Sequence, residues 1–268
     1  MNGTSYLLLA YYSLKESLVY IKNTMVFLLF SAFGLLIQYS AWYALYWSVD
    51  FMPVMGRSFE TMLSYQILMV LIRSFTDANG ISRQLEQRMV SGEIALDFLR
   101  PVAPRGMLIA RSWGEKIFQM ATDLVVFSVA VLAVGGIQSP ASIEMMGLFL
   151  LSLCLGYLIN LMFELLMGTF AFWFVEVNTL KWFIDFFQLA MSGAIVPLWL
   201  LPDWLQFCTK LLPFQAILYA PAQIYLGGMS NMEIVQTMGL QVFWILLLMG
   251  LQELLWRRGK RRIVVLGG

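Results

Sequence analysis

The sequence has no histidine and only two cysteines among its 268 residues. The lack of histidine removes the usual proton shuttle at neutral pH and the commonest ligand of transition metals. Cys154 and Cys208 have no second cysteine at metal-binding or redox spacing. The sequence therefore predicts neither a disulfide framework nor a metal site.

Catalytic motifs are missing as well. The chain contains no GxxxxGKS or GxxxxGKT loop for binding phosphate. An HExxH motif is impossible without histidine, and neither a GxSxG turn nor a Ser/His/Asp set occurs. We therefore expect no catalytic site, and no cofactor bound by this chain itself.

Charge is scarce, because Asp, Glu, Lys and Arg make up only 12% of the residues. Soluble domains carry roughly 25% charged residues. Hydrophobic residues reach 60%, and the mean hydropathy is +0.76. Several windows run for about 20 residues without charge, the length that crosses a ~30 Å hydrocarbon core. One soluble core cannot bury so many windows, so the composition predicts an all-α, polytopic membrane protein.

The apolar windows predict six membrane spans within a single domain that covers residues 1–268. The predicted spans are 23–47, 59–75, 113–135, 143–175, 182–200 and 234–256. Lys and Arg decide the orientation, because basic loops stay in the cytoplasm. With an inside N-terminus, only Arg57 and Lys210 of the 17 basic residues lie outside. Both termini are therefore predicted to be cytoplasmic.

The basic tail "WRRGKRR" directly follows the last span. Its position is explained by topology and by contact with anionic lipid headgroups, so we predict no nucleic-acid partner. The N-terminus lacks the basic start and the cleavage site of a signal peptide. We expect it to stay on the mature chain.

Residues 1–22 show a helical repeat of apolar side chains. The repeating positions are Leu7, Tyr11, Leu14, Leu18 and Ile21. This pattern predicts a helix that lies in the inner membrane interface. The alternative is that the segment merely extends the first span.

Residues 197–231 form an apolar stretch that is interrupted by prolines at four positions, Pro197, Pro202, Pro213 and Pro221. A proline inside a helix removes a backbone hydrogen bond and clashes with the preceding turn. We therefore predict two short helices that dip into the outer leaflet as a re-entrant segment, which also contains Phe214. The alternative is an interfacial loop of no functional consequence.

Residues 77–112 carry an unusual density of charge for this chain. One predicted helical stripe is apolar and consists of Leu85, Met89, Gly92, Leu96 and Leu99. A neighbouring stripe is charged and consists of Glu86, Glu93, Asp97 and Arg100. The two stripes predict a two-faced cytoplasmic helix, with one face on the inner ends of the spans and the charged face toward a soluble partner.

The ends of this helix are also predicted from the sequence. Ser91 is expected to cap a helix that starts at Gly92, with Glu93 near its positive end. Pro101 and Pro104 are expected to stop it. A plain connecting loop is the alternative, although such loops are usually shorter in compact bundles.

Three acidic residues are expected within the bilayer, namely Asp123, Glu164 and Asp185. Such charges usually face the bundle interior or water. Lys181 lies one helical turn before Asp185 and is expected to pair with it, and a role of Asp185 in the pathway is the alternative. For Asp123 and Glu164 two interpretations stay open: structural pairing, for example with Arg73, or lining a cavity for a cationic or amphipathic substrate.

The segment "ISRQLEQRMVSGEIALDFLRPVAPRGMLIARSWGEK" resembles the cytoplasmic loop of type-2 ABC transporter permeases. The matching residues are Gly92, Ile94, Leu99, Arg100 and Pro101. The outer segment, with Pro197, Pro202, Trp204, Leu212-Pro213-Phe214 and Pro221, is similar to the re-entrant segment of that class. More narrowly, the chain is similar to the bacterial branch that is often encoded as two different permeases beside one ATPase.

The resemblance implies half of a transmembrane pathway in the bacterial cytoplasmic membrane, completed by a second copy or a related permease. Two separate ATPase subunits would bind ATP and Mg, and residues 82–100 would form the coupling helix that they engage. The implied coupling residues are Leu85, Met89, Gly92, Glu93, Leu96, Asp97, Leu99, Arg100 and Pro101. The expected activity is export of a hydrophobic or amphipathic drug, peptide or lipid-like compound. An ATP-independent secondary transporter that uses Asp123 and Glu164, or a non-transporting scaffold, is the alternative.

Overall fold

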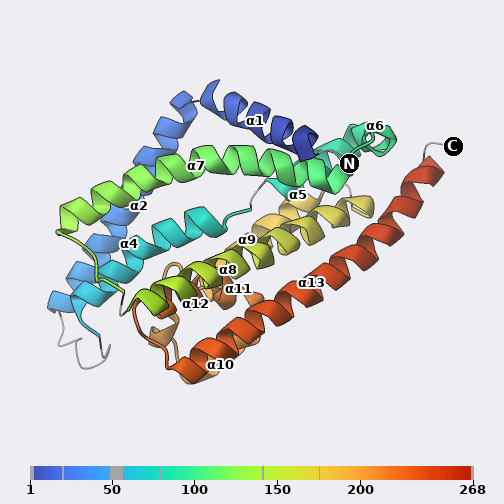
Figure 1. Ribbon diagram of the computed structural model, residues 1–268. Helices are drawn as coiled ribbons and strands as arrows, with labels where there is room; N and C mark the ends of the chain where they lie inside the picture. The colour runs from blue at the N-terminus through green and yellow to red at the C-terminus, as the bar shows by residue number, and fades with distance from the viewer. Residues whose placement is uncertain are drawn as a thin grey trace.

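The computed structural model describes residues 3–19, 21–48, 57–78, 80–140, 142–174 and 176–266, and every regular element in these ranges is a helix (Figure 1). The α-helices are α1 (Gly3–Val19), α2 (Ile21–Ser48), α4 (Phe59–Thr76), α5 (Ile81–Val90), α6 (Glu93–Leu99), α7 (Pro104–Val134), α8 (Ile143–Thr169), α9 (Val177–Met191), α10 (Asp203–Lys210), α11 (Pro213–Ile217), α12 (Tyr219–Tyr225) and α13 (Asn231–Leu266). Two 3-10 turns, η1 (Phe170–Phe172) and η2 (Leu198–Leu200), complete the set. The all-α prediction is confirmed.

Four helices in the described ranges are long and apolar enough to cross a membrane. These stretches are Leu28–Trp47, Pro104–Val134, Ile143–Phe172 and Asn231–Arg262. The predicted second and fifth spans correspond to α4 and α9, which are not among them. The helix α9 has only 15 residues, and the 18 residues of α4 include Glu60, Gln66 and Arg73. Length and hydropathy alone therefore support four of the six predicted spans.

The boundaries of two predicted spans are wrong. The helix α9 ends at Met191, nine residues before the predicted end, and Gly193 follows in the left-handed region with φ +80°. The helix α7 starts at Pro104, which was expected to stop a helix. Proline suits the first helical position because its missing N–H would have no intrahelical partner there. Only Pro101, just after α6, acts as the predicted stop.

The helix α8 is the centre of the bundle. Half of its membrane-length window is buried inside the protein, against 6% of the windows in α2 and α7. The main hydrophobic cluster joins α8 to α4, α11, α12 and α13. A Cβ on Gly156 of α8 would lie only 2.8 Å from the carbonyl oxygen of Ile217, so glycine allows the end of α11 to touch the α8 backbone. The outer segment is thus built into the core.

The predicted outer segment contains η2 and the short helices α10, α11 and α12, one more helix than expected. The helices α11 and α12 are mostly buried, and Pro213 and Phe214 lie in the first turn of α11. Pro221 is buried within α12. By contrast, α10 exposes Trp204 and Phe207. The prolines therefore mark breaks between several short helices.

The first helix, α1, packs along α7 (Figure 1). A Cβ on Gly114 of α7 would lie 2.1 Å from the carbonyl oxygen of Ala10. Leu7, Tyr11 and Leu18 of the predicted apolar line are exposed, so they face away from the protein. The start of α1, the helix α6 and the end of α13 lie at one end of the bundle, and α10 lies at the other (Figure 1).

Candidate functional site

Two short helices follow α4: α5 packs against α8, and α6 projects from the end of the bundle where α13 ends (Figure 1). Gly92 joins them in the left-handed region, with φ +76°. Ser91 is not the predicted N-cap: Gly92 holds that position of α6 without a side-chain cap, and Ser91 ends α5, although its hydroxyl accepts a hydrogen bond from the backbone N–H of Glu93 at 3.4 Å. Because the helix breaks at Gly92, the two predicted stripes do not continue from α5 into α6.

The break changes which residues of α6 face outward, although Glu93 and Arg100 are exposed as predicted. Asp97, predicted on the partner-facing charged stripe, is only 2% exposed and forms ion pairs with Arg88 and with Arg100, the latter at 3.3 Å. Leu96 and Leu99, predicted to rest on the spans, are 59% and 82% exposed. The outer face of α6 therefore presents two leucines beside the exposed charges of Glu93 and Arg100.

On α5 the apolar prediction is closer to the structure. Leu85 is fully buried and Met89 packs partly against the same cluster. Glu86 is not directed at a soluble partner: its Oε1 atom accepts hydrogen bonds from the backbone N–H groups of Val177 at 3.1 Å and Asn178 at 3.3 Å. These N–H groups belong to the first turn of α9, which has no intrahelical partner for them.

Glu164 lies in a buried polar network between α5, α8 and α9. Its Oε2 atom accepts hydrogen bonds from the Ser82 hydroxyl at 2.8 Å and the Ser82 N–H at 3.3 Å. Its Oε1 atom lies 2.8 Å from the Lys181 ammonium. Lys181 also pairs with Asp185 at 2.7 Å, as predicted. Of the two interpretations of Glu164, the structure supports pairing, with a lysine from another helix.

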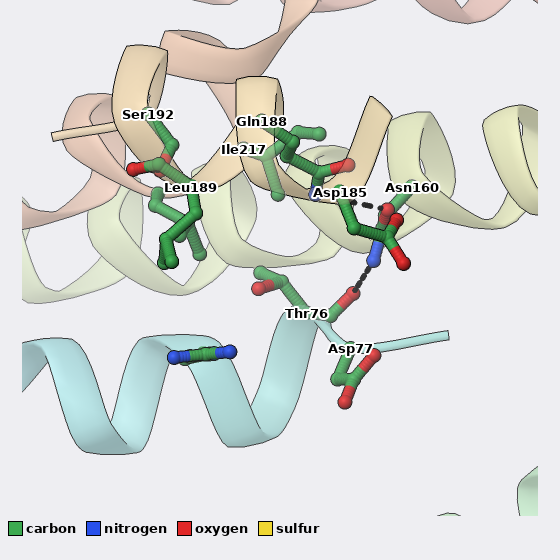
Figure 2. A pocket seen from close by; sticks show the side chains of 10 residues that line it. Thr76, Asp77, Asn160, Asp185, Gln188, Leu189, Ser192 and Ile217 are labelled. Atoms are coloured by element: carbon green, nitrogen blue, oxygen red, sulfur yellow. Dashed lines mark hydrogen bonds between the residues drawn. The ribbon is translucent and has the colours of Figure 1, made fainter. Parts of the chain in front are cut away.

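A polar cavity of about 130 Å³ opens between α4, α8, α9 and α11. Its lining residues are Arg73, Thr76, Asp77, Asn160, Asp185, Gln188, Leu189, Ser192, Ile217 and Leu218. Figure 2 shows the Asn160 amide between α4 and α9, donating to the Thr76 carbonyl oxygen at 3.0 Å and accepting from Gln188 at 3.4 Å. Asp77 lies next to Thr76 at the end of α4 (Figure 2), and Asp185 belongs to α9.

Neither predicted pathway residue lines this cavity. Glu164 is enclosed by its pair with Lys181, and Asp123 lies half-buried on α7, within electrostatic range of Arg73 and Asp77. The lining residues come from four helices with no shared spacing in sequence. The available signal was the presence of Asn160 and Gln188 in apolar helices, where amides require partners.

At the opposite end of the bundle, Arg57 fastens the outer segment. Its guanidinium lies 4.2 Å from the centre of the Trp199 ring and donates to the Gln223 side-chain oxygen at 3.0 Å. The Tyr65 hydroxyl donates to the Gly193 carbonyl oxygen at 2.7 Å. Pro197 and Pro202 precede η2 and α10, respectively. Hydrogen bonds and ring contacts thus hold η2 and α12 to the start of α4.

These features define the class of protein: a helical membrane protein with a partly open polar cavity between its helices and a structured two-helix element at one end. The family model described as ABC-2 family transporter protein matches residues 51–267. This chain therefore belongs to the ABC-2 family, and the resemblance to type-2 ABC permeases is confirmed. No curated protein matches the sequence.

Membership makes the chain the transmembrane component of an ABC transporter, a component that is not itself catalytic. Permeases of this family generally work with ATPase subunits. The described residues contain no group of three or more Cys, Asp or Glu that could hold a metal ion.

Proposed function

We propose that this chain is the permease subunit of an ATP-driven bacterial exporter and that α5 and α6 receive the ATPase. The observation that carries the proposal is the exposure of Leu96 and Leu99 on a helix fixed by the buried Asp97 carboxylate. An exposed apolar face on a rigid element favours a protein partner. Two ATPase subunits would bind ATP and Mg and drive the movement.

The proposed topology has six spans with both termini in the cytoplasm. The positions of α1, α6 and the end of α13 at one end of the bundle support it, because an even number of crossings returns the chain to its starting side (Figure 1). In this arrangement α4 and α9 are short spans that rely on protein neighbours. The helix α1 lies in the inner interface, and α10 to α12 form the outer re-entrant segment.

A second permease, identical or related, would cover the face that carries α9. Asp185 is 47% exposed and Arg73 is exposed as well, although both lie on apolar helices. Charged groups in the membrane face protein or water and avoid lipid. The exposed aromatic residues Trp182, Phe183 and Phe186 on α9 supply apolar surface for such a partner.

The proposed cargo is a hydrophobic or amphipathic compound, a drug, peptide or lipid-like molecule, that moves outward. The polar cavity supports a substrate with a polar head, because Asp77, Asp185 and Arg73 offer it charges of both signs. The pairing of Glu164 with Lys181 argues against its use as a free proton site in a secondary transporter. Asp123 stays a predicted pathway residue.

Co-purification tests the proposal. The complete chain, extracted from its native membrane in mild detergent, is expected to bring an ATPase with it. Leu96→Asp and Leu99→Asp, which place charge on the exposed face of α6, are expected to remove the ATPase while the permease keeps its elution volume and yield. Leu99→Met keeps the face apolar and serves as the control. Recovery of a stable wild-type permease with no ATPase partner overturns the proposal.

A further inference from the structure

We propose that Glu86 and Ser82 of α5 are positioning residues that pass the movement of α5 to α9 and, through it, to the polar cavity. The inference rests on the proposed function, because an ATPase at α5 and α6 supplies the movement. It adds a specific receiving element, α9, and the contacts by which that helix is held.

The first contact is the cap that α5 provides for α9. Glu176 stands at the N-cap position of α9 but makes no side-chain capping bond. The Glu86 carboxylate of α5 takes this role and accepts from the N–H groups of Val177 and Asn178. A carboxylate is also favourable at the positive end of a helix. The start of α9 is thus satisfied by a group on α5, and the two must move together to keep these bonds.

The second contact is the buried network around Glu164. Ser82 of α5 and Lys181 of α9 bind the two oxygens of the same carboxylate on α8. All three side chains are buried, so no water replaces a broken bond at small cost. A displacement of Ser82 therefore moves the Glu164 carboxylate, which forms the ion pair with Lys181 of α9.

Among the helices that α9 contacts, α5 has the largest single contact with it, more extensive than that of α8 or α11. The opposite face of α9 is exposed, with Phe183, Phe186 and Phe187 among its residues. Lys181 binds Asp185, and Asp185 lines the cavity with Gln188. A shift of α9 therefore changes the polar wall of the cavity.

The test follows α5 and α9 separately in the complete chain with its co-purified ATPase, in lipid nanodiscs. The exposed Cys154 and Cys208 are first replaced by serine. Spin labels are placed at the exposed Gln87 of α5 or Phe183 of α9, each paired with a label at the exposed Leu246 of α13. Trapping of the ATPase with ATP and vanadate is expected to change both distances.

The decisive variant is Glu86→Ala. We expect the distance from the α5 label to the α13 label to change as in the parent. In the α9 pair, the ratio of molecules with the changed distance to molecules with the original distance is expected to fall about fivefold, the effect of losing one capping interaction. Glu86→Gln keeps an oxygen acceptor and is expected to restore the response. Glu176→Ala removes a carboxylate from the same helix end but no capping bond, and is expected to change nothing. These differences separate positioning from a general loss of structure.

Several results overturn the inference. One is an α9 response of full size in Glu86→Ala, and another is an equal loss in Glu176→Ala, which points to charge alone. A third is an α9 distance that stays fixed in the parent while α5 moves. If Glu86→Ala does not assemble, Ser82→Ala carries the test, since it removes only the hydroxyl contact with Glu164 and is expected to weaken the α9 response. Failure of any ATPase to co-purify instead overturns the proposed function.

Discussion

The Arg88 guanidinium of α5 and the Asp97 carboxylate of α6 form an ion pair across the turn at Gly92. Asp97 is almost fully buried and also contacts Arg100 at 3.3 Å. A carboxylate in this position fixes the angle between two helices that a left-handed glycine would otherwise leave free to vary. The pair therefore determines which side of α6 is presented at the end of the bundle.

Asp97→Ala is expected to release α6 from α5. The change leaves Arg88 without its buried partner, and breaking a buried pair in this way typically costs about 3–5 kcal/mol. Hydrogen exchange of residues 91–100 measures the effect, and we expect faster exchange there than in the parent. Glu93→Ala removes an exposed carboxylate of α6 and is the control. Equal protection of residues 91–100 in Asp97→Ala and the parent contradicts the prediction.

Much of the fold could be predicted because it follows from local patterns. Uncharged windows located α2 and the long helices α7, α8 and α13, and the pattern of Lys and Arg predicted that the two termini share one side. The limits of α9 could not be predicted in the same way. Its end depends on Gly193, whose left-handed conformation places its carbonyl oxygen at the Tyr65 hydroxyl of another helix. Such tertiary contacts leave no periodic signal.

The site was less predictable for the same physical reason. The pair of Lys181 and Asp185 lies within one helix and was anticipated from spacing. The partners of Glu164 come from α5 and α9, which are distant in sequence, so its pairing stayed open. The sides of α6 on which Leu96, Asp97 and Leu99 lie were predicted wrongly because a single glycine, Gly92, interrupts a stripe that looks continuous in a helical projection.

The contact of α1 with α7 depends on glycine at position 114. Gly114→Ala would place a Cβ 2.1 Å from the Ala10 carbonyl oxygen and 2.8 Å from Ser13 Cβ, so α1 must move away. We expect a loss of about 1–3 kcal/mol, as for other overpacked sites. Thermal unfolding in detergent measures it. Gly147→Ala on α8 meets nothing within 4 Å and is expected to be neutral or stabilising. Equal stability of the two variants contradicts the prediction.

The Glu164 and Lys181 pair predicts strong non-additivity. Lys181→Met leaves a buried carboxylate without its cation and is expected to cost about 3–5 kcal/mol. The double variant Glu164→Gln with Lys181→Met is expected to be less destabilised than the sum of the single changes, because no buried charge is left without a partner. Asp185 also loses Lys181 in this variant, but its side chain is 47% exposed to begin with. Unfolding by SDS in mixed micelles measures the change in the free energy of unfolding for each single variant and for the double variant. Simple additivity contradicts a direct interaction.

The polar cavity predicts a dependence on substrate charge. Asp185→Asn keeps the size of the side chain but removes a negative charge from the cavity wall, so transport of cationic dyes is expected to fall more than transport of neutral compounds. The predicted pathway residue gives a matched comparison, since Asp123→Asn removes the same charge outside the cavity lining. The flux of cationic and of neutral compounds into proteoliposomes that contain the permease and the ATPase is measured for both variants. An equal loss for cationic and neutral compounds in Asp185→Asn contradicts a role in recognising charge.

Arg57 is expected to hold the outer segment in place through a contact that lysine cannot reproduce. Its planar guanidinium stacks on Trp199 and donates to Gln223, whereas an ammonium lacks both the flat surface and the forked donors. Arg57→Ala is expected to lose about 1–2 kcal/mol from the cation–π contact and the hydrogen bond together, and Arg57→Lys to recover only part of it. Proteolysis of residues 197–231 during unfolding measures the change. Lys210→Ala removes the other outer cation, an exposed one, and should leave the segment as stable as in the parent. If Lys210→Ala weakens the segment as much as Arg57→Ala does, the loss of an outer positive charge explains the effect and the specific contact with Trp199 does not.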